Sequence, residues 1–285
     1  MTGWNVDPLE LAAVGLAAAL YARRARTLAR RGRPVPRYRL ASFVLGLALV
    51  ALALVSPIDT LGEERLFSVH MLQHLLLGDL GPLFVVLGLD GRLLRPLLAL
   101  PVVHRLRVLA HPLVALPLWG LDFCLWHAPP LFDAALRHDA VHALQHGLFF
   151  AFGTLLWAAL LEPLPGPAWF SAPWRIPYVL VMWLVMLVLA QVFIWSTHAY
   201  YEPYLHDPRL WGLSPLDDQK AGGGVMLVES AFTMIGALVW LLFVVFRESE
   251  ARQRLLDAGV EPRAAARAAR YRAVHAREAP ASRAS

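Results

Sequence analysis

The chain has 285 residues, of which 58% are hydrophobic and only 16% are charged. A soluble domain averages about 25% charged residues, so this composition excludes an ordinary soluble fold and favours an all-α, polytopic membrane protein. The net charge of +5 does not indicate a nucleic-acid partner, because the arginines lie in predicted loops and in the tail rather than on one folded face. The single cysteine, Cys124, excludes an internal disulfide framework and a CxxC motif.

Seven apolar stretches are long enough, or nearly so, to cross a hydrocarbon core of about 30 Å. They predict one bundle of seven transmembrane helices over residues 1–246 and an Arg- and Ala-rich tail over residues 247–285, partly disordered. No cleavable signal peptide is expected, because the first apolar stretch lacks a clear cleavage site. The expected spans are residues 8–21, 40–55, 66–89, 112–127, 140–161, 176–197 and 222–246.

Charge in the loops predicts the orientation of these spans. The linker after the first span and the loop after the third span are rich in arginine, as is the tail. By the positive-inside rule these segments face the cytoplasm, so the amino terminus is expected outside and the carboxyl terminus inside. Within the third span, Gly78 and Pro82 are expected to bend the helix. The long loop before the seventh span is acidic, as an outer loop should be.

Histidines gather at the outer ends of the predicted spans. Two pairs, His70 with His74 and His142 with His146, have i,i+4 spacing, which puts both imidazoles of each pair on one helix face about 5–6 Å apart. Histidine is costly inside a bilayer and usually marks a site there. A pair taken alone is equally explained as an interhelical hydrogen-bonding pair. The predicted metal ligands are His70, His74, His127, His142, His146 and His198.

Neutral imidazoles with thioethers nearby suit copper better than magnesium or calcium, although imidazole alone also suits zinc and iron. Six histidines are too many for one Cu(I) ion, so either two ions bind or some of the histidines only orient others. Gln73 and Gln145 are expected to hold ligand imidazoles in one tautomer. Packing is favoured over ligation for Met71, Met226 and Cys124. The predicted accessory residues are Met71, Cys124, Met226, Glu229, Asp217, Asp218, Gln73 and Gln145.

Four motifs together resemble the CtaG family of bacterial cytochrome c oxidase assembly proteins, the seven-span, caa-type group. The motifs are His70-Met71-Leu72-Gln73-His74, Leu125-Trp126-His127-Ala128-Pro129, His142-Ala143-Leu144-Gln145-His146, and Thr197-His198-Ala199-Tyr200-Tyr201 with the later Asp217-Asp218-Gln219-Lys220. The resemblance covers about residues 66–247. It implies a non-enzymatic protein of the bacterial plasma membrane that helps to mature a haem–copper oxidase by supplying copper. The implied partners are the oxidase subunits and an external copper donor.

Three other functions remain open. A membrane haem protein would use paired histidines as axial ligands, but the i,i+4 doubling is more typical of a compact metal centre, so copper is favoured over haem. A copper transporter would need ligands continuing across the bilayer, and only Asp79, Cys124 and Gln191 lie deeper. A scaffold would hold oxidase subunits without binding metal.

Overall fold

The computed structural model describes residue 4, residues 8–205 and residues 210–275. Over these ranges every regular element is helical, which confirms the all-α prediction. The chain divides into two compact units. The first comprises Met1–Gly166 and Met182–Ala231, and the second comprises Pro167–Val181 and Phe232–Ser285.

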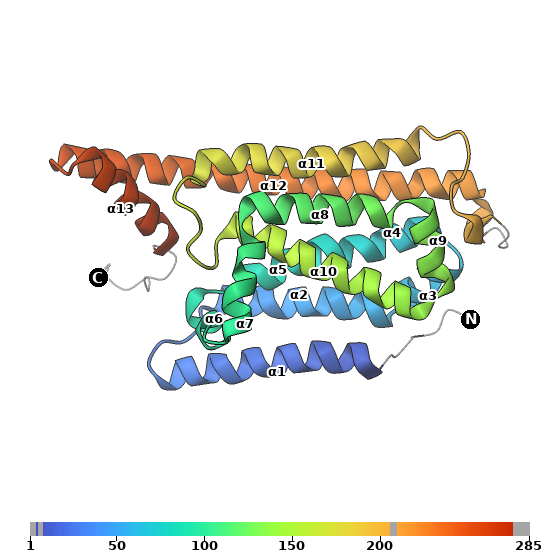
Figure 1. Ribbon diagram of the computed structural model, residues 1–285, viewed down its shortest axis with the longest axis horizontal. Helices are drawn as coiled ribbons and strands as arrows, with labels where there is room; N and C mark the ends of the chain where they lie inside the picture. Colours follow the sequence, from blue (N-terminus) through green and yellow to red (C-terminus); the bar gives the residue numbers. More distant parts are fainter. Residues whose placement is uncertain (1–3, 5–7, 206–209, 276–285) are drawn as a thin grey trace. The chain divides into compact units, whose positions relative to one another are not determined.

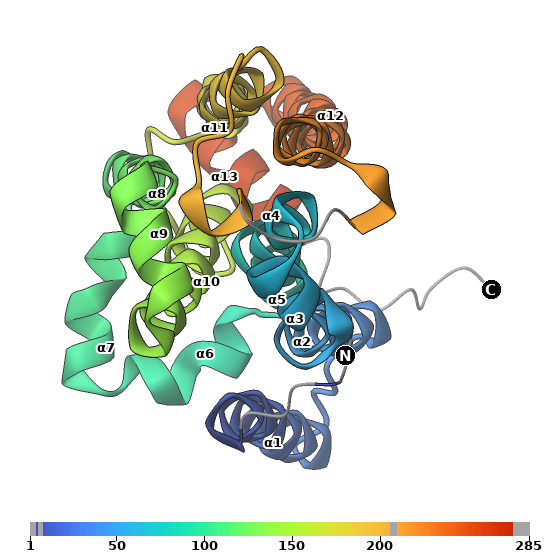
Figure 2. The ribbon, with the colours of Figure 1, turned by 90° about the vertical axis from the view of Figure 1, so that its right-hand side faces the viewer.

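The first unit carries the predicted histidine cluster. Its amino-terminal half consists of α1 (Pro8–Arg30), α2 (Arg37–Val55), α3 (Pro57–Glu64), α4 (Phe67–Leu75), the π-helical turn η1 (Leu76–Leu80) and α5 (Gly81–Leu87). In both ribbon views α1 lies at the edge of this unit, beside α2 (Figures 1 and 2).

The rest of the first unit contains short connecting helices and one long central helix. These elements are α6 (Gly91–Leu98), α7 (Pro101–Leu106), η2 (Arg107–Ala110), α8 (Pro112–Trp126), α9 (Pro129–Arg137), α10 (Asp139–Leu161), η3 (Glu202–Tyr204) and η4 (Leu210–Gly212). The carboxyl-terminal part of α11 (Ala172–Ile194) and the amino-terminal part of α12 (Pro215–Asp257) complete this unit.

Close helix contacts bring the two histidine pairs together. Helix α10 packs against α8, η1 and α5. A Cβ atom at Gly153 of α10 would overlap the carbonyl of Gly78, so only glycine permits this close crossing. A Cβ atom at Gly222 would lie 2.6 Å from the ring of Phe67, and its absence lets α12 lie against the start of α4. Small residues at these two crossings therefore set the spacing around the site.

The expected bend near Gly78 and Pro82 takes the form of a π-helical turn. The amide of Gly81 donates to the carbonyl of Leu76, five residues earlier. Proline lacks an amide hydrogen, so Pro82 cannot continue the ordinary ladder, and the wider π turn absorbs the mismatch. The helix continues to Leu87, and Phe67–Leu87 qualifies as one span.

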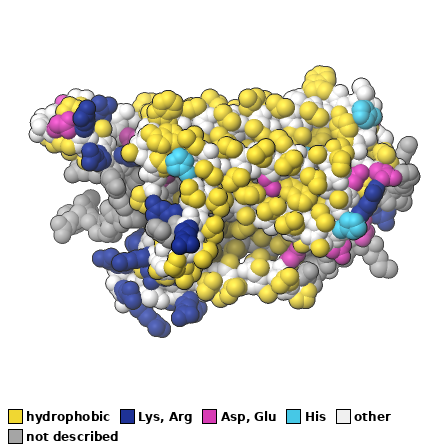
Figure 3. Space-filling view, in the orientation of Figure 1, with side chains coloured by type: hydrophobic (Ala, Val, Ile, Leu, Met, Phe, Trp, Pro, Cys, Tyr) yellow, Lys and Arg dark blue, Asp and Glu magenta, His cyan; other side chains and the backbone are white. Residues whose placement is uncertain are grey.

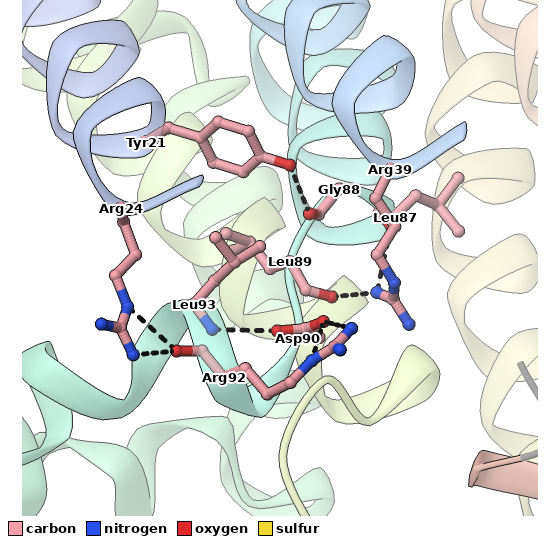
Figure 4. Close-up of polar contacts among 9 residues, drawn as sticks. All are labelled: Tyr21, Arg24, Arg39, Leu87, Gly88, Leu89, Asp90, Arg92 and Leu93. Atoms are coloured by element: carbon pink, nitrogen blue, oxygen red, sulfur yellow. Dashed lines mark hydrogen bonds and ion pairs between the residues drawn. The ribbon is translucent and has the colours of Figure 1, made fainter. Parts of the chain in front are cut away.

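Side chains of α1 and α2 hold the end of α5 (Figure 4). The Tyr21 hydroxyl donates to the carbonyl of Gly88 at 3.1 Å, and Arg39 donates to the carbonyl of Leu89. Carbonyl groups at a helix end need partners, and these two donors come from helices distant in sequence. Arg24 of α1 donates to the carbonyl of Arg92, in the first turn of α6, at 2.7 Å. The contacts fix α1 to the remainder of the first unit.

Five helices of the described chain are long and apolar enough to cross a membrane. They are α2, the α4–η1–α5 helix, α10, α11 and α12. A sixth span results if the segment Pro101–Ala110 and helix α8 are counted together, although they bend by 77°. Helix α8 alone has 15 residues, about 22 Å, which is short for a hydrocarbon core. Helix α1 carries Glu10 and several arginines and does not qualify. The chain is thus compatible with a multi-pass membrane protein.

Charges on the first unit separate toward its two ends. On the face drawn in Figure 3, hydrophobic side chains cover the middle, with basic side chains near α6 and α7 and acidic ones near α3 and α9. Exposed arginines at the first end include Arg30, Arg95 and Arg105, and exposed acidic residues at the other include Glu64 and Glu202. Such a belt is the distribution expected of a protein in a bilayer.

The second unit contains the carboxyl-terminal part of α12 and the helix α13 (Pro262–His275). Arg270 of α13 donates to the carbonyls of Ala168, Pro167 and Phe170 at 2.6, 3.0 and 3.1 Å. Part of the predicted tail is therefore helical, whereas the last residues, 280–285, expected to be disordered, lie outside the described residues. Helix α12 continues through residue 246, and the domain boundary placed there stays a prediction.

Candidate metal centre

Four of the six predicted ligands come together in the first unit. One ring nitrogen from each of His70, His74, His142 and His146 lies within 4.8 Å of the others. All four side chains are buried. Ring centroids are 4.2 Å apart within the α4 pair and 4.0 Å apart within the α10 pair. Across the two helices the separations are 5.3 Å for His70–His142 and 5.7 Å for His74–His146. We call these residues the four-histidine centre.

The hydrogen bonds of His70 define its tautomer. The hydroxyl of Tyr204 donates its only hydrogen to the carbonyl of Gly62 at 2.6 Å. The same hydroxyl lies 2.8 Å from Nδ1 of His70, so it must accept a hydrogen from that nitrogen. In the neutral imidazole, Nε2 of His70 then carries the lone pair, and that atom faces the centre.

The second histidine of α4 completes a hydrogen bond inside the centre. Nε2 of His74 lies 2.7 Å from Nε2 of His70. Because Nε2 of His70 carries a lone pair, His74 donates its Nε2 hydrogen to it. The lone pair of His74 is therefore on Nδ1, a buried atom that has no hydrogen-bond partner.

Two further imidazoles are held in the same way. Nδ1 of His142 lies 2.6 Å from a carboxylate oxygen of Glu63 on α3, and Nε2 is buried without a partner. Nδ1 of His127 donates to the carbonyl of Phe123 at 2.6 Å, and its Nε2 is also buried without a partner. Carboxylates and carbonyls that bind one ring nitrogen leave the other available as a metal ligand.

His127 follows the end of α8 and lies beside the four-histidine centre rather than within it. Its ring centroid is 5.7 Å from that of His74. The hydroxyl of Tyr201 donates to the carbonyl of His127 at 2.8 Å. Burial, followed by the nearby Asp133 carboxyl, raises the pKa of Tyr201, so its hydroxyl stays a neutral donor. His127 is thus fixed through its ring and through its backbone.

One predicted ligand, His198, and one predicted accessory residue, Cys124, lie away from the centre. The side chain of His198 is exposed, with its ring centroid 4.8 Å from that of Tyr200. Cys124 is also exposed. The expectation that Cys124 is a buried packing residue is therefore wrong.

Two of the three predicted accessory acids form hydrogen bonds in the first turn of a helix, outside the four-histidine centre. Asp218 on α12 accepts hydrogen bonds from the amides of Phe67 and Ser68, at 2.6 and 3.2 Å, and so caps the first turn of α4. Asp217 is exposed and bonds Ser214 in the first turn of α12. Glu229 is half-buried on α12 and is not among the four-histidine ligands.

The glutamines do not contact the imidazoles as expected. Gln73 donates to the carbonyl of Ala53 at 3.1 Å and to Asp59 at 2.7 Å, which ties α4 to α2 and α3. The side-chain amide of Gln145 is buried, and neither its nitrogen nor its oxygen has a hydrogen-bond partner. Glu63 and Tyr204 take the orienting role predicted for the glutamines.

Met71 and Met226 are buried and line a cavity of about 20 Å³ next to the four-histidine centre. Met186 of α11 lines it as well and was not predicted. His74 and His127 form part of the same wall.

Comparison with known proteins agrees with the motifs. A family model described as cytochrome c oxidase caa3 assembly factor matches residues 19–248. The chain belongs to this family. The resemblance to oxidase assembly proteins is thereby confirmed, and the match includes every residue of the four-histidine centre.

Relatives of this family member include uncharacterized proteins of Mycobacterium bovis and Mycobacterium tuberculosis. Each is 27% identical over an alignment of 268 positions, and the alignment covers 85% of this chain and 39% of the relative. The chain thus spans about two fifths of the length of these relatives. No solved structure matches the chain.

Proposed function

We propose that this family member binds copper at the four-histidine centre and supplies it to cytochrome c oxidase during assembly. We further propose that it crosses the bacterial plasma membrane seven times, with its amino terminus and the histidine centre at the outer side. The oxidase subunits and an external copper donor are its partners in this proposal, and it catalyses no reaction. Copper is the cargo, taken up and released by ligand exchange.

The observation that carries the proposal is the set of fixed imidazole tautomers. Nδ1–H donates to Tyr204 in His70 and to Glu63 in His142, which leaves Nε2 of each ring as an acceptor. One ring nitrogen of each of these two residues also lies within 4.8 Å of ring nitrogens of His74 and His146. A buried pair that served only helix packing would need no such gathering, because one hydrogen bond between the helices would satisfy it. Several imidazole nitrogens gathered at one place are what a cation with soft or borderline character needs.

The dimensions of the centre suit a single ion after a small adjustment. Metal–nitrogen bonds of about 2 Å at tetrahedral angles separate two ligand nitrogens by about 3.3 Å. The other nitrogens of the centre lie within 4.8 Å of one another, whereas the two Nε2 atoms of α4 are 2.7 Å apart. Entry of an ion therefore requires the His70 and His74 rings to separate by roughly 0.6 Å, with a proton lost or moved to Nδ1 of His74, and the nitrogens farthest apart to approach by up to about 1.5 Å.

A haem is a poorer match than copper. The axial ligands of a haem come from opposite sides of a macrocycle, which needs a wide apolar slot between them. The cavity beside the centre has a volume of about 20 Å³ and the histidine rings of α4 and α10 are packed against one another. This compactness supports an ion rather than a macrocycle.

The test is metal content and optical spectrum of detergent-purified protein loaded with Cu(I) under reducing conditions. The variant His70→Ala/His142→Ala removes one ligand from each helix, and His198→Ala is the matched control because its ring is exposed outside the centre. Wild type and control are expected to hold about one or two copper ions per chain, and the double variant to lose the ion of the four-histidine centre.

Other outcomes lead to the rival functions. A Soret band would favour the haem protein, and copper uptake across the bilayer in vesicles would favour the transporter. Absence of both metal and haem, with normal oxidase assembly in cells that carry the double variant, would favour a scaffold.

A further inference from the structure

We propose that the cavity beside the four-histidine centre is a second site, rich in thioether groups, for a monovalent soft cation such as Cu(I). This inference rests on the proposed function and assigns a second position to the same cargo. His74 belongs to both sites, since it is part of the four-histidine centre and also lines the cavity.

The sulfur ligands come from three helices. Met71 of α4, Met186 of α11 and Met226 of α12 line the cavity, and each side chain is 1% exposed. Methionine often fills irregular gaps in a core, so burial alone does not indicate a site. Here, however, three thioethers border an open volume instead of filling it. A cavity of about 20 Å³ has room for one water-sized occupant.

Two nitrogens at the cavity wall point to a ligand. Nε2 of His127 and Nδ1 of His74 have no hydrogen-bond partner, and both side chains are 5% exposed. Each carries a lone pair in the tautomer defined by its other ring nitrogen. A buried acceptor without a partner is unfavourable, and an ion or a water in the cavity would relieve both at once. Imidazole nitrogens together with thioethers are the donors that suit Cu(I) and not Zn²⁺.

A carboxyl group supplies the charge that a buried cation needs. Asp79, placed by the π-helical turn, also lines the cavity. One of its oxygens accepts a hydrogen bond of 2.6 Å from Nε1 of Trp157. In its carboxylate form Asp79 would balance one positive charge, which matches Cu(I) better than a divalent ion.

The two sites together give the cargo a short path by ligand exchange. An ion in the four-histidine centre is bound in part by His74, and rotation or tautomer change of that ring presents a lone pair to the cavity. No electron is transferred in this step, and the ion keeps its charge while one nitrogen ligand is replaced by sulfur. The path runs deeper along α4 toward η1.

The experiment compares silver and zinc binding in a Cys124→Ser background, because the exposed thiol of Cys124 would itself bind silver. Ag(I) has the charge and softness of Cu(I) and does not change oxidation state. The variant Met71→Leu/Met226→Leu removes two thioethers with side chains of similar volume. The variant His70→Ala/His142→Ala removes the four-histidine centre instead.

We expect the background protein to bind one more Ag(I) per chain than Met71→Leu/Met226→Leu binds. Zn²⁺ binding should be equal in these two proteins and lost in His70→Ala/His142→Ala. X-ray absorption of the Cu(I)-loaded background should show sulfur scattering that the methionine variant lacks. Retained Zn²⁺ binding shows that the methionine variant is folded. The single variant Met226→Leu provides the same comparison if the double variant does not fold.

If the methionine variant keeps the Ag(I) stoichiometry and the sulfur scattering of the background protein, the proposal of a second site is wrong. This is the result expected if the cavity holds only water. If Ag(I) binding is then still lost in His70→Ala/His142→Ala, the proposed function survives without this inference. If the background protein binds no soft ion at all, both proposals fail.

Discussion

Replacing Tyr204 by phenylalanine removes one oxygen atom and tests the tautomer argument directly. The hydroxyl donates to the carbonyl of Gly62 and accepts from Nδ1 of His70, whose side chain is completely buried. Without it, a buried donor and a buried acceptor lose their partners, at about 1–3 kcal/mol each. We therefore expect the free energy of unfolding to fall by at least about 2 kcal/mol.

The same change weakens copper binding. Loss of a group that orients a ligand imidazole typically lowers metal affinity about 10–100-fold, or about 1.4–2.7 kcal/mol. We place Tyr204→Phe at the upper end, because His70 has no solvent contact that would replace the lost acceptor. Nε2 of His70 is then free to become the protonated nitrogen, and that tautomer cannot bind an ion.

The assay is a competition titration of Cu(I) between the purified protein and a coloured Cu(I) chelator, with thermal unfolding measured in parallel. Tyr200→Phe is the matched control, because this tyrosine is only half-buried and packs beside the exposed His198. A folded Tyr204→Phe protein with the Cu(I) affinity of wild type would refute the reasoning that the hydroxyl fixes the ligand tautomer.

Three further changes have expected outcomes. Glu63→Gln should lower Cu(I) affinity about tenfold in the same titration, which is a smaller loss than that expected for Tyr204→Phe. The reason is that the Glu63 side chain is 36% exposed, so water can replace its contact with His142. Equal losses of affinity in the two variants would contradict this ranking. Gly153→Ala should lower the unfolding temperature, with a cost of about 1–3 kcal/mol from overpacking, whereas Gly147→Ala on the same helix meets open space and should be neutral or stabilising. Trp157→Phe should cost about 1–3 kcal/mol in chemical denaturation by removing the donor to the carboxyl group on η1, and no loss would show that this buried bond contributes nothing.

The sequence allowed the helices and most of the centre to be predicted. Long apolar stretches give helix positions directly, and α2 and α10 begin and end within three residues of the predicted spans 40–55 and 140–161. The i,i+4 spacing placed each histidine pair on one face, and the common depth of the spans brought the pairs together. These features depend on local periodicity, which a single sequence displays.

What the sequence did not reveal depends on contacts between distant residues. Glu63 and Tyr204 orient the imidazoles of the centre, yet nothing in their local pattern distinguishes them from loop residues. His198 was expected at the end of its helix, but α11 ends at Ile194 and His198 lies exposed in the following loop. The 43-residue helix α12 extends beyond its apolar stretch at both ends, because its polar turns continue the helix without a break. Sequence periodicity predicts which residues share a helix face. Which polar residues on that face contact the imidazoles depends on how the helices pack in three dimensions.

The hydrogen bond between the Nε2 atoms of His70 and His74 also bears on how readily the proposed cargo would leave. When no ion separates these two rings, their nitrogens satisfy each other at 2.7 Å. Under the proposed function, loss of the ion would replace a metal–nitrogen bond by this hydrogen bond, so release would cost less free energy than from ligands that form no such bond. This is the behaviour expected of a protein that delivers an ion rather than one that retains it.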